Sequence, residues 1–174
     1  TNIVGGNFRI TELVAAVACE QLKKLDGLNK QRLALVSSLS EGLKKFKCLE
    51  VPEAPKDAHA TFYVYPLRFL PEKSNGLSRK QFAEILKAEG IVFAEGYIKP
   101  LYFLPIFQTR TAFTNGYPWS APENRESKPN YAAGACPNAE RLYEREMLTN
   151  QSICPPQTEE DMEDILKAME KVLG

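Results

Sequence analysis

Two stretches of the 174-residue chain carry side chains that could do chemistry. The first, Gly5 to Glu12, places a glycine turn, an amide, a guanidinium and a helix start in close order. Backbone N–H groups, the Asn7 amide and the Arg9 guanidinium can all donate hydrogen bonds to one anionic group such as a phosphate. A capped helix start without a ligand explains the same residues equally well, so both interpretations stay open.

The second stretch, residues 96–107, alternates aromatic residues with prolines. Proline lacks the backbone donor that helices and strands need, so this segment is predicted to be a loop. Tyrosines on such a rigid loop, here Tyr97 and Tyr102, are typical of the wall of a small-molecule pocket. The alternative is that the rings only fill an apolar gap, and composition alone favours neither interpretation.

Composition excludes several other kinds of site. The four cysteines (Cys19, Cys48, Cys136 and Cys154) form no C-x-x-C pair, and the single histidine, His59, leaves too few ligands for a structural zinc site. A net charge of zero argues against a nucleic-acid binder, and no apolar run approaches the ~18 residues that span a membrane. The sequence therefore indicates a soluble, cytoplasmic protein that binds neither nucleic acid nor membrane.

A helix must position the first stretch. Thr11 is a good N-cap, and Glu12 in the first turn suits the helix dipole. Residues 13–19 are apolar on every face, which predicts burial against another domain or another subunit. The Asp-Gly pair at 26–27 is expected to bend or break this helix, and a second helical segment with an apolar stripe is predicted over residues 28–46.

The rest of the chain alternates short strands with capped helices. Strands are predicted near residues 61–70, 91–94 and 151–154, helices near 78–89, 139–146 and 158–173, and mostly irregular structure over 95–138. Pro66 favours an edge or a bulge in the first of these strands. This order predicts an α+β fold, a small, mainly antiparallel sheet covered by helices, with 78–89 and 158–173 on one face.

The first stretch also resembles a known family. Residues 5–25 are similar to the G-x-N-[FY]-R-[ML]-[TS]-E-x-x-A-A…Q-L-x-x-L signature of the DegT-type sugar aminotransferases, fold-type I enzymes that use pyridoxal phosphate (PLP). Three later blocks, at 62–67, 97–105 and 136–161, resemble the family's aromatic strand, its Y-x-P-L-[HY]…P block and its P-x-A-E…P-x-x-T-x-x-D pattern. The similarity is closest to members that serve lipopolysaccharide and other surface-sugar pathways.

This resemblance implies that the chain is the C-terminal domain of a fold-type I PLP aminotransferase. Residues 1–46 would be linking and interface helices and residues 47–174 the C-terminal α+β domain. A large N-terminal domain, absent from this chain, would carry the Schiff-base lysine. The chain itself would then hold no catalytic residue and would bind no PLP covalently.

The resemblance also implies roles for four residues. In a homodimer, Asn7 would contact the PLP phosphate of the other subunit, and Arg9, Tyr97 and Tyr102 would bind substrate at the mouth of the active site. Tyr102 stands where many members have His, which leaves the substrate contacts there open. In the chain alone, we expect residues 1–12 to be poorly ordered or the first helix to be covered by another copy.

The implied activity transfers an amino group, usually from glutamate, to a keto-sugar nucleotide for surface polysaccharide or lipopolysaccharide biosynthesis. The cofactor would supply the electron-sink chemistry and the protein would orient it. Two alternatives stay open: a non-catalytic binding or regulatory module that keeps only this domain, and a PLP- or PMP-dependent sugar dehydratase of the same family. Both depend on residues that precede Thr1.

Overall fold

The computed structural model describes residues 8–174, and a four-stranded antiparallel sheet with the strand order β1-β2-β4-β3 lies at the centre of this part. The strands are β1 (Leu49–Glu50), β2 (Tyr65–Phe69), β3 (Ala94–Glu95) and β4 (Met147–Asn150). The α+β fold with a small antiparallel sheet, expected from the sequence, is confirmed.

The alternation along β2 gives the sheet one apolar face. Tyr65, Leu67 and Phe69 are fully buried on that face, whereas Pro66 and Arg68 point to the other. β2 is a central strand, so the edge position expected from Pro66 is wrong. Because β1 pairs only with Arg68 and Phe69, one side of β2 is nevertheless open at Pro66, which explains how a proline fits there.

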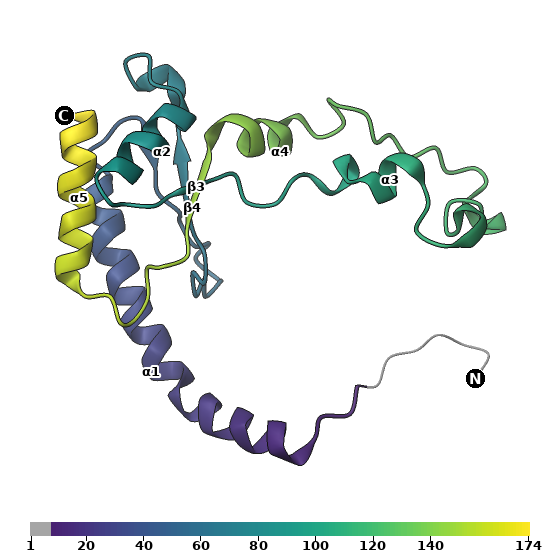
Figure 1. Ribbon diagram of the computed structural model, residues 1–174, viewed down its shortest axis with the longest axis horizontal. Helices are drawn as coiled ribbons and strands as arrows, with labels where there is room; N and C mark the ends of the chain where they lie inside the picture. The colour runs from purple at the N-terminus through teal and green to yellow at the C-terminus, as the bar shows by residue number, and fades with distance from the viewer. Residues whose placement is uncertain (1–7) are drawn as a thin grey trace.

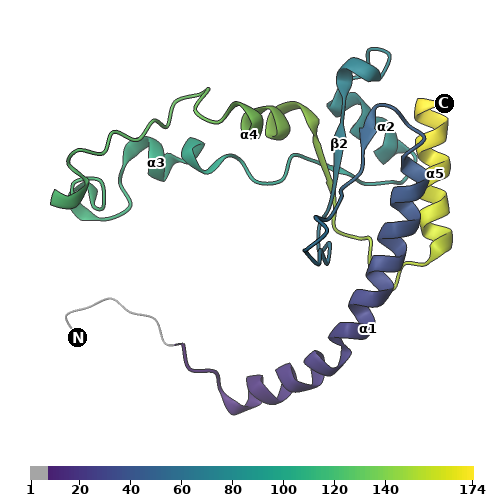
Figure 2. The ribbon, with the colours of Figure 1, turned by 180° about the vertical axis from the view of Figure 1, so that it is seen from behind.

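Three helices cover the apolar face: α1 (Glu12–Leu43), α2 (Arg79–Ala88) and α5 (Glu159–Leu173). Figures 1 and 2 show all three on the same side of the sheet, with α5 beside α1, so the prediction that α2 and α5 share one face is confirmed. Their fully buried side chains pack with β2 and β4 into one core, and those of the helices are Leu39, Leu43, Phe82, Leu86, Met162 and Met169.

The caps of α2 and α5 follow the sequence signals. At the start of α2, the Ser78 hydroxyl accepts the Gln81 N–H at 3.2 Å and the Gln81 side chain accepts the Ser78 N–H at 3.0 Å. At the start of α5, the Asp161 carboxylate accepts the Thr158 N–H at 2.7 Å. Gly90 follows α2 with φ +89°, a conformation that glycine adopts without strain. These local hydrogen bonds fix where both helices begin and end.

The first helix is longer than expected. Thr11 caps it as predicted, with its hydroxyl accepting the Val14 N–H at 3.4 Å, but α1 runs unbroken through the Asp-Gly pair at 26–27. A glycine inside a helix costs only about 1 kcal/mol, so the flanking helix formers prevail. Figure 1 shows that α1 curves along its length, and only its C-terminal part, from Leu35 onward, belongs to the core.

Three predicted strands have different bounds. The strand expected at 61–70 starts only at Tyr65, and Phe62 before it has φ +49°, outside the extended region. The strand expected at 91–94 contains only Ala94 and Glu95. The segment 151–154 is not a strand. Its place beside β2 is taken by β4, which ends where the side chain of Asn150 accepts the Ser152 N–H at 2.6 Å in an Asx turn.

A long excursion, which we call the arm (residues 97–136), leaves the sheet after β3 and projects away from the core in Figures 1 and 2. As expected, it is mostly irregular, with short helical turns at Leu101–Phe103, Pro105–Thr109 (α3), Thr114–Gly116 and Pro122–Asn124. The chain returns to β4 through α4 (Pro137–Arg141) and a π-helical turn, Leu142–Glu146. Among the described residues, no helix is long and apolar enough to cross a membrane.

Candidate functional site

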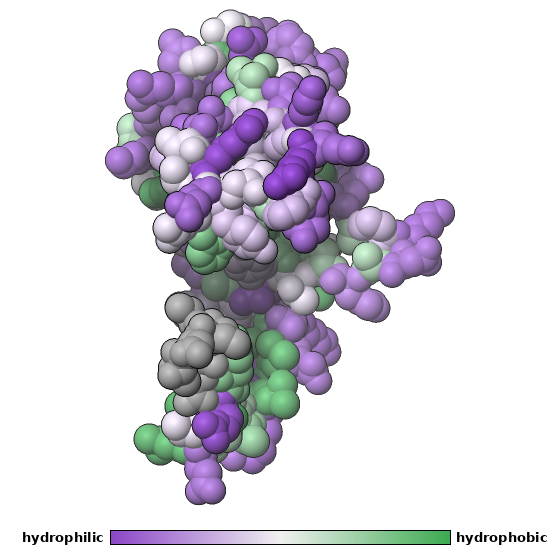
Figure 3. All heavy atoms as spheres, turned by 90° about the vertical axis from the view of Figure 1, so that its right-hand side faces the viewer, coloured by the Kyte–Doolittle hydropathy of each residue, from purple (hydrophilic) through white to green (hydrophobic). Residues whose placement is uncertain are grey.

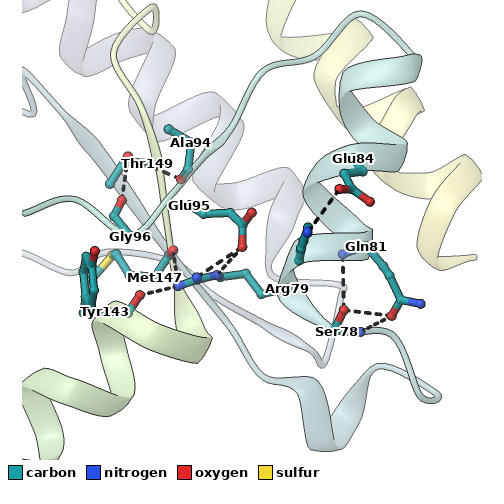
Figure 4. A network of polar contacts seen from close by, with 11 residues as sticks. Ser78, Arg79, Gln81, Glu84, Ala94, Glu95, Gly96, Tyr143, Met147 and Thr149 are labelled. Atoms are coloured by element: carbon teal, nitrogen blue, oxygen red, sulfur yellow. Dashed lines mark hydrogen bonds and ion pairs between the residues drawn. The ribbon is translucent and has the colours of Figure 1, made fainter. Parts of the chain in front are cut away.

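Gly96 sets the direction in which the arm leaves the sheet. It is buried with φ +66°, its N–H donates to the Met147 carbonyl at 2.7 Å, and its own carbonyl accepts the Thr149 hydroxyl at 3.1 Å (Figure 4). A Cβ at this position would lie 3.1 Å from the ring of Tyr143. Only glycine suits both the backbone angle and this close approach, so Tyr97, the next residue, has a fixed starting direction.

Tyr97 forms a pair of exposed phenols with Tyr63. The two hydroxyls share a short hydrogen bond, although 34 residues separate them in the sequence. This hydrogen bond raises the pKa of Tyr97 above its ordinary value, so the Tyr97 hydroxyl is protonated at neutral pH. The pair therefore offers two adjacent aromatic edges and hydroxyls that can bind a polar ligand beside the sheet.

Tyr102 is held by a carboxylate. Its hydroxyl donates a short hydrogen bond to Glu140 of α4, and Glu140 also accepts the Gly134 N–H at 2.8 Å. Desolvation, together with the neighbouring Glu140, raises the pKa of Tyr102 to about 12. The hydrogen bonds from Tyr102 and Gly134 lower the pKa of Glu140. At neutral pH this is therefore a neutral phenol that donates to an ionised carboxylate.

Arg79 anchors the base of the arm from the core side. Its side chain is 10% exposed and its guanidinium donates to the Tyr143 carbonyl at 2.7 Å, the Met147 carbonyl at 3.2 Å and the Glu95 carboxylate at 3.2 Å (Figure 4). Both carbonyls lie at the end of the returning segment, and Glu95 lies just before the outgoing one. One buried cation thus joins the first turn of α2 to the residue pair before the arm, at Glu95, and to the segment that follows it, at Tyr143 and Met147.

The outer part of the arm has its own aromatic cluster, formed by Phe107, Trp119 and Tyr131. The three rings meet edge to face, and the Trp119 indole N–H donates to the Tyr131 hydroxyl at 2.8 Å. Beside them lies a cavity of about 180 Å³ with Arg110 in its wall. Phe107 thus fills an apolar gap, as one interpretation of the second stretch expected, whereas the hydroxyls of Tyr97 and Tyr102 both take part in hydrogen bonds.

Three of the four predicted site residues, Arg9, Tyr97 and Tyr102, lie within the described part of the chain. Asn7 lies outside the described residues. Arg9 lies in the exposed segment before α1, and Figures 1 and 2 both draw the start of α1 apart from the arm that carries Tyr97 and Tyr102. Among the described residues of one chain, the start of α1 and the arm therefore lie apart.

Two residues that form hydrogen bonds with the predicted tyrosines were not predicted, Tyr63 and Glu140. Tyr63 lies 68% exposed just before β2, and Glu140 is half-buried in α4. Both stand inside the blocks at 62–67 and 136–161 that carry the family resemblance, and that was the one signal that pointed to them. Residues 8–174 contain no group of three or more His, Cys, Asp or Glu side chains that could hold a metal ion.

Comparison with known proteins gives one family. A model described as the DegT/DnrJ/EryC1/StrS aminotransferase family matches residues 1–123. A curated relative from Micromonospora echinospora, a "putative L-glutamine:3-amino-2,3-dideoxy-scyllo-inosose aminotransferase", is 39% identical over 80 residues, which make up 44% of this chain and 19% of the relative.

Solved structures of similar fold cover almost the whole chain. S. venezuelae DesV in complex with a ketimine intermediate has a TM-score of 0.71 at 22% identity, over 98% of this chain and 38% of that one. Helicobacter pylori PseC, an aminotransferase of pseudoaminic acid biosynthesis, has a TM-score of 0.67 at 20% identity, over 99% and 40% of the two chains. At these identities the likeness shows the fold, and this chain spans about two fifths of the length of those structures.

Proposed function

The chain belongs to the DegT/DnrJ/EryC1/StrS aminotransferase family, and we propose that it is the C-terminal part of a PLP-dependent enzyme that aminates a keto-sugar nucleotide. It covers 38% of the DesV chain, so the activity of the whole protein is our inference from the family. The amino donor in this proposal is glutamate, the working form is a homodimer in the cytoplasm, and the product serves surface polysaccharide or lipopolysaccharide biosynthesis.

The observation that carries the proposal is the exposed apolar start of α1. Leu13, Val14 and Val17 are 77%, 54% and 56% exposed, whereas Leu39 and Leu43 of the same helix are fully buried. Figure 3 shows apolar side chains gathered on the lower part of the molecule, where α1 begins. Apolar surface of this kind marks an interface, as expected for a helix that brings the residues before it to a neighbouring domain and subunit.

This chain does not fit the role of holding PLP covalently. Every one of its lysines is exposed, and a lysine that forms a covalent bond to the cofactor has to lie in a pocket that also encloses the ring. When bound, PLP supplies an electron sink for the transfer of the amino group. We therefore propose that the cofactor-bearing lysine belongs to another domain and that Asn7 contributes a hydrogen bond to the cofactor phosphate in the partner subunit.

The remaining predicted residues bind the substrate in this proposal. The Arg9 guanidinium is suited to a phosphate of the nucleotide, since it donates in a planar fork. Tyr97 and Tyr102, both fixed by hydrogen bonds to their hydroxyls, are suited to orient the sugar at the mouth of the site. Because the start of α1 and the arm lie apart in one chain, we propose that the complete site combines the arm of one subunit with the segment before α1 of the other.

Two alternatives predict different results. A dehydratase of the same family would have histidine in place of the cofactor-bearing lysine, and a regulatory module would have neither. The curated relative, whose printed name describes an aminotransferase that uses L-glutamine, favours amino transfer over both. The residue that decides between them lies outside this chain.

The first experiment tests whether the chain carries the cofactor-bearing lysine. We expect incubation with PLP, borohydride reduction and peptide mass analysis to give only scattered, substoichiometric labelling of exposed lysines. One stoichiometric adduct on a single lysine would contradict the proposal. In the full-length protein, we expect mass spectrometry to detect the transfer of an amino group from glutamate to a keto-sugar nucleotide. Loss of one water molecule from the sugar, through removal of a sugar hydroxyl and without amination, would support the dehydratase instead.

The second experiment tests Asn7. In the full-length protein, Asn7→Ala should weaken PLP retention by about 1–3 kcal/mol, the usual cost of removing one partner of a hydrogen-bonded charged group. Asn2→Ala, outside the family signature, is the matched control and should retain PLP like the wild type. If Asn7→Ala also retains PLP like the wild type, the phosphate role of Asn7 is wrong.

A further inference from the structure

One carboxylate joins the outgoing and returning segments of the arm. Glu140 accepts the hydroxyl of Tyr102 from the outgoing segment. From the returning segment it accepts the Gly134 N–H, at 2.8 Å to Oε1 and 2.9 Å to Oε2, and the Cys136 N–H at 3.4 Å to Oε1. Four hydrogen bonds from three residues therefore meet on a single side chain.

A second, uncharged link lies one turn further along the arm. The Gln108 side-chain amide donates to the Tyr102 carbonyl at 2.5 Å and to the Tyr131 carbonyl at 2.8 Å. Tyr102 is thus held at both ends, by its hydroxyl through Glu140 and by its carbonyl through Gln108. Because the charged acceptor makes the stronger hydrogen bonds, Glu140 dominates this arrangement.

The charge state agrees with the geometry. Glu140 accepts in all four of its hydrogen bonds, which suits the ionised carboxylate, and the hydrogen bonds from Tyr102, Gly134 and Cys136 lower its pKa. Tyr102 has one proton, and it donates that proton to Glu140. The orientation of the Tyr102 ring therefore depends on a carboxylate that is half-buried and 38 residues away in the sequence.

We propose that Glu140 is a positioning residue: it fixes the phenol of Tyr102, and with it the base of the arm, in the orientation in which Tyr102 meets the substrate. Glu140 acts through Tyr102 and does not itself touch the substrate. The part of this proposal that concerns the substrate rests on the proposed function. The contact of Glu140 with both segments of the arm does not.

The test in the 174-residue chain compares Glu140→Gln and Tyr102→Phe with the wild type. We expect amide hydrogen exchange at Gly134, followed by NMR, to become roughly tenfold faster in Glu140→Gln, the factor that corresponds to replacing a charged acceptor with a neutral amide oxygen. In the same variant, the ultraviolet titration of Tyr102, assigned by difference from Tyr102→Phe, should shift towards the ordinary pKa of tyrosine. Glu144→Gln, an exposed carboxylate in the following turn, is the matched control and should change neither signal.

Rescue separates positioning from a general loss of structure. Tyr102→His retains an N–H that can donate to Glu140, so Gly134 should exchange about as slowly in this variant as in the wild type. In Tyr102→Phe, which has no such donor, Gly134 should exchange faster. This comparison holds even if Glu140→Gln fails to fold. The proposal would be overturned if exchange at Gly134 were unchanged in both Glu140→Gln and Tyr102→Phe. It would also be overturned if the pKa of Tyr102 were the same in Glu140→Gln as in the wild type.

In the full-length enzyme, Glu140→Gln should raise KM for the keto-sugar nucleotide about tenfold, with a smaller effect on the half-reaction with the amino donor. An equal loss in both half-reactions would mean that Glu140 supports the fold and does not position Tyr102 for the substrate. If the wild type transfers no amino group at all, the proposed function fails, while the exchange and titration measurements on the chain still decide whether Glu140 holds Tyr102.

Discussion

The guanidinium of Arg79 donates a hydrogen bond to the backbone carbonyl of Tyr143 at 2.7 Å, although 64 residues separate the two in the sequence. Arg79 stands at the first turn of α2, and Tyr143 lies where the returning end of the arm approaches β4. The contact therefore determines how the arm is attached to the core, and the first prediction concerns its removal.

Arg79→Ala should destabilise the chain by about 2–4 kcal/mol, because it removes the buried guanidinium that donates to the Tyr143 carbonyl and to the Glu95 carboxylate. Urea unfolding followed by circular dichroism measures the change. Lys80→Ala is the control in the same helix: its ion pair with Glu84 is 4.0 Å long and exposed, so we expect a change within about 0.5 kcal/mol. Equal effects of the two variants would show that the Arg79 contacts add nothing to stability.

The second prediction concerns two glycines of α1. A Cβ on Gly42 would lie 2.3 Å from a methyl group of Leu166 in α5, whereas a Cβ on Gly27 would meet no atom within 4 Å. Gly42→Ala should therefore destabilise by about 1–3 kcal/mol through overpacking, and Gly27→Ala should stabilise by roughly 0.5–1 kcal/mol through helix propensity. Opposite shifts of the urea midpoint are expected, and two shifts of the same sign would contradict the close crossing of α1 and α5.

The third prediction uses the single tryptophan, Trp119, as a reporter of the arm. Its indole N–H donates to Tyr131, and the two rings lie 6.4 Å apart. Tyr131→Ala removes both the acceptor and the ring, so iodide should quench the Trp119 fluorescence at least about twofold more strongly as the cluster opens. Tyr117→Ala, which removes a ring that contacts only Phe113 among the ring pairs of the described residues, is the control and should leave quenching nearly unchanged.

The fourth prediction concerns alkaline pH. Burial raises the pKa of Tyr65 from 10.0 to about 12, and its hydroxyl lies 2.9 Å from that of Ser40. Because the unfolded chain loses the Tyr65 proton first, this group contributes its full stability below about pH 10 and loses it as the pH rises to about 12, a change of about 2–3 kcal/mol.

Urea unfolding of the wild type and of Tyr65→Phe at about pH 8 and about pH 11.5 measures this contribution. The wild type should lose about 2 kcal/mol more than the variant between the two conditions. Tyr102, whose pKa is also raised to about 12, titrates in both proteins, so its effect cancels in the difference. Parallel pH profiles would contradict the assignment to Tyr65.

The sequence by itself determined the features that depend on near neighbours. Ser78 with Gln81 and Thr158 with Asp161 predicted the starts of α2 and α5, because the groups that cap a helix lie within three residues of each other. The apolar spacing of α5 predicted the face that carries Met162 and Met169. The four blocks of family resemblance also predicted the fold class, because each block is a short pattern that can be recognised in the sequence alone.

Tertiary structure decided what depends on residues far apart. The final strand is β4 and not 151–154, because a strand forms where a partner can pair with it, and β2 pairs with Met147–Asn150. In the same way, no local pattern could join Tyr102 to Glu140 or Arg79 to Tyr143. A hydrogen bond between distant segments forms only after the core has placed them side by side. The sequence therefore predicted Tyr97 and Tyr102, and only the tertiary structure showed that Tyr63 and Glu140 are their hydrogen-bond partners.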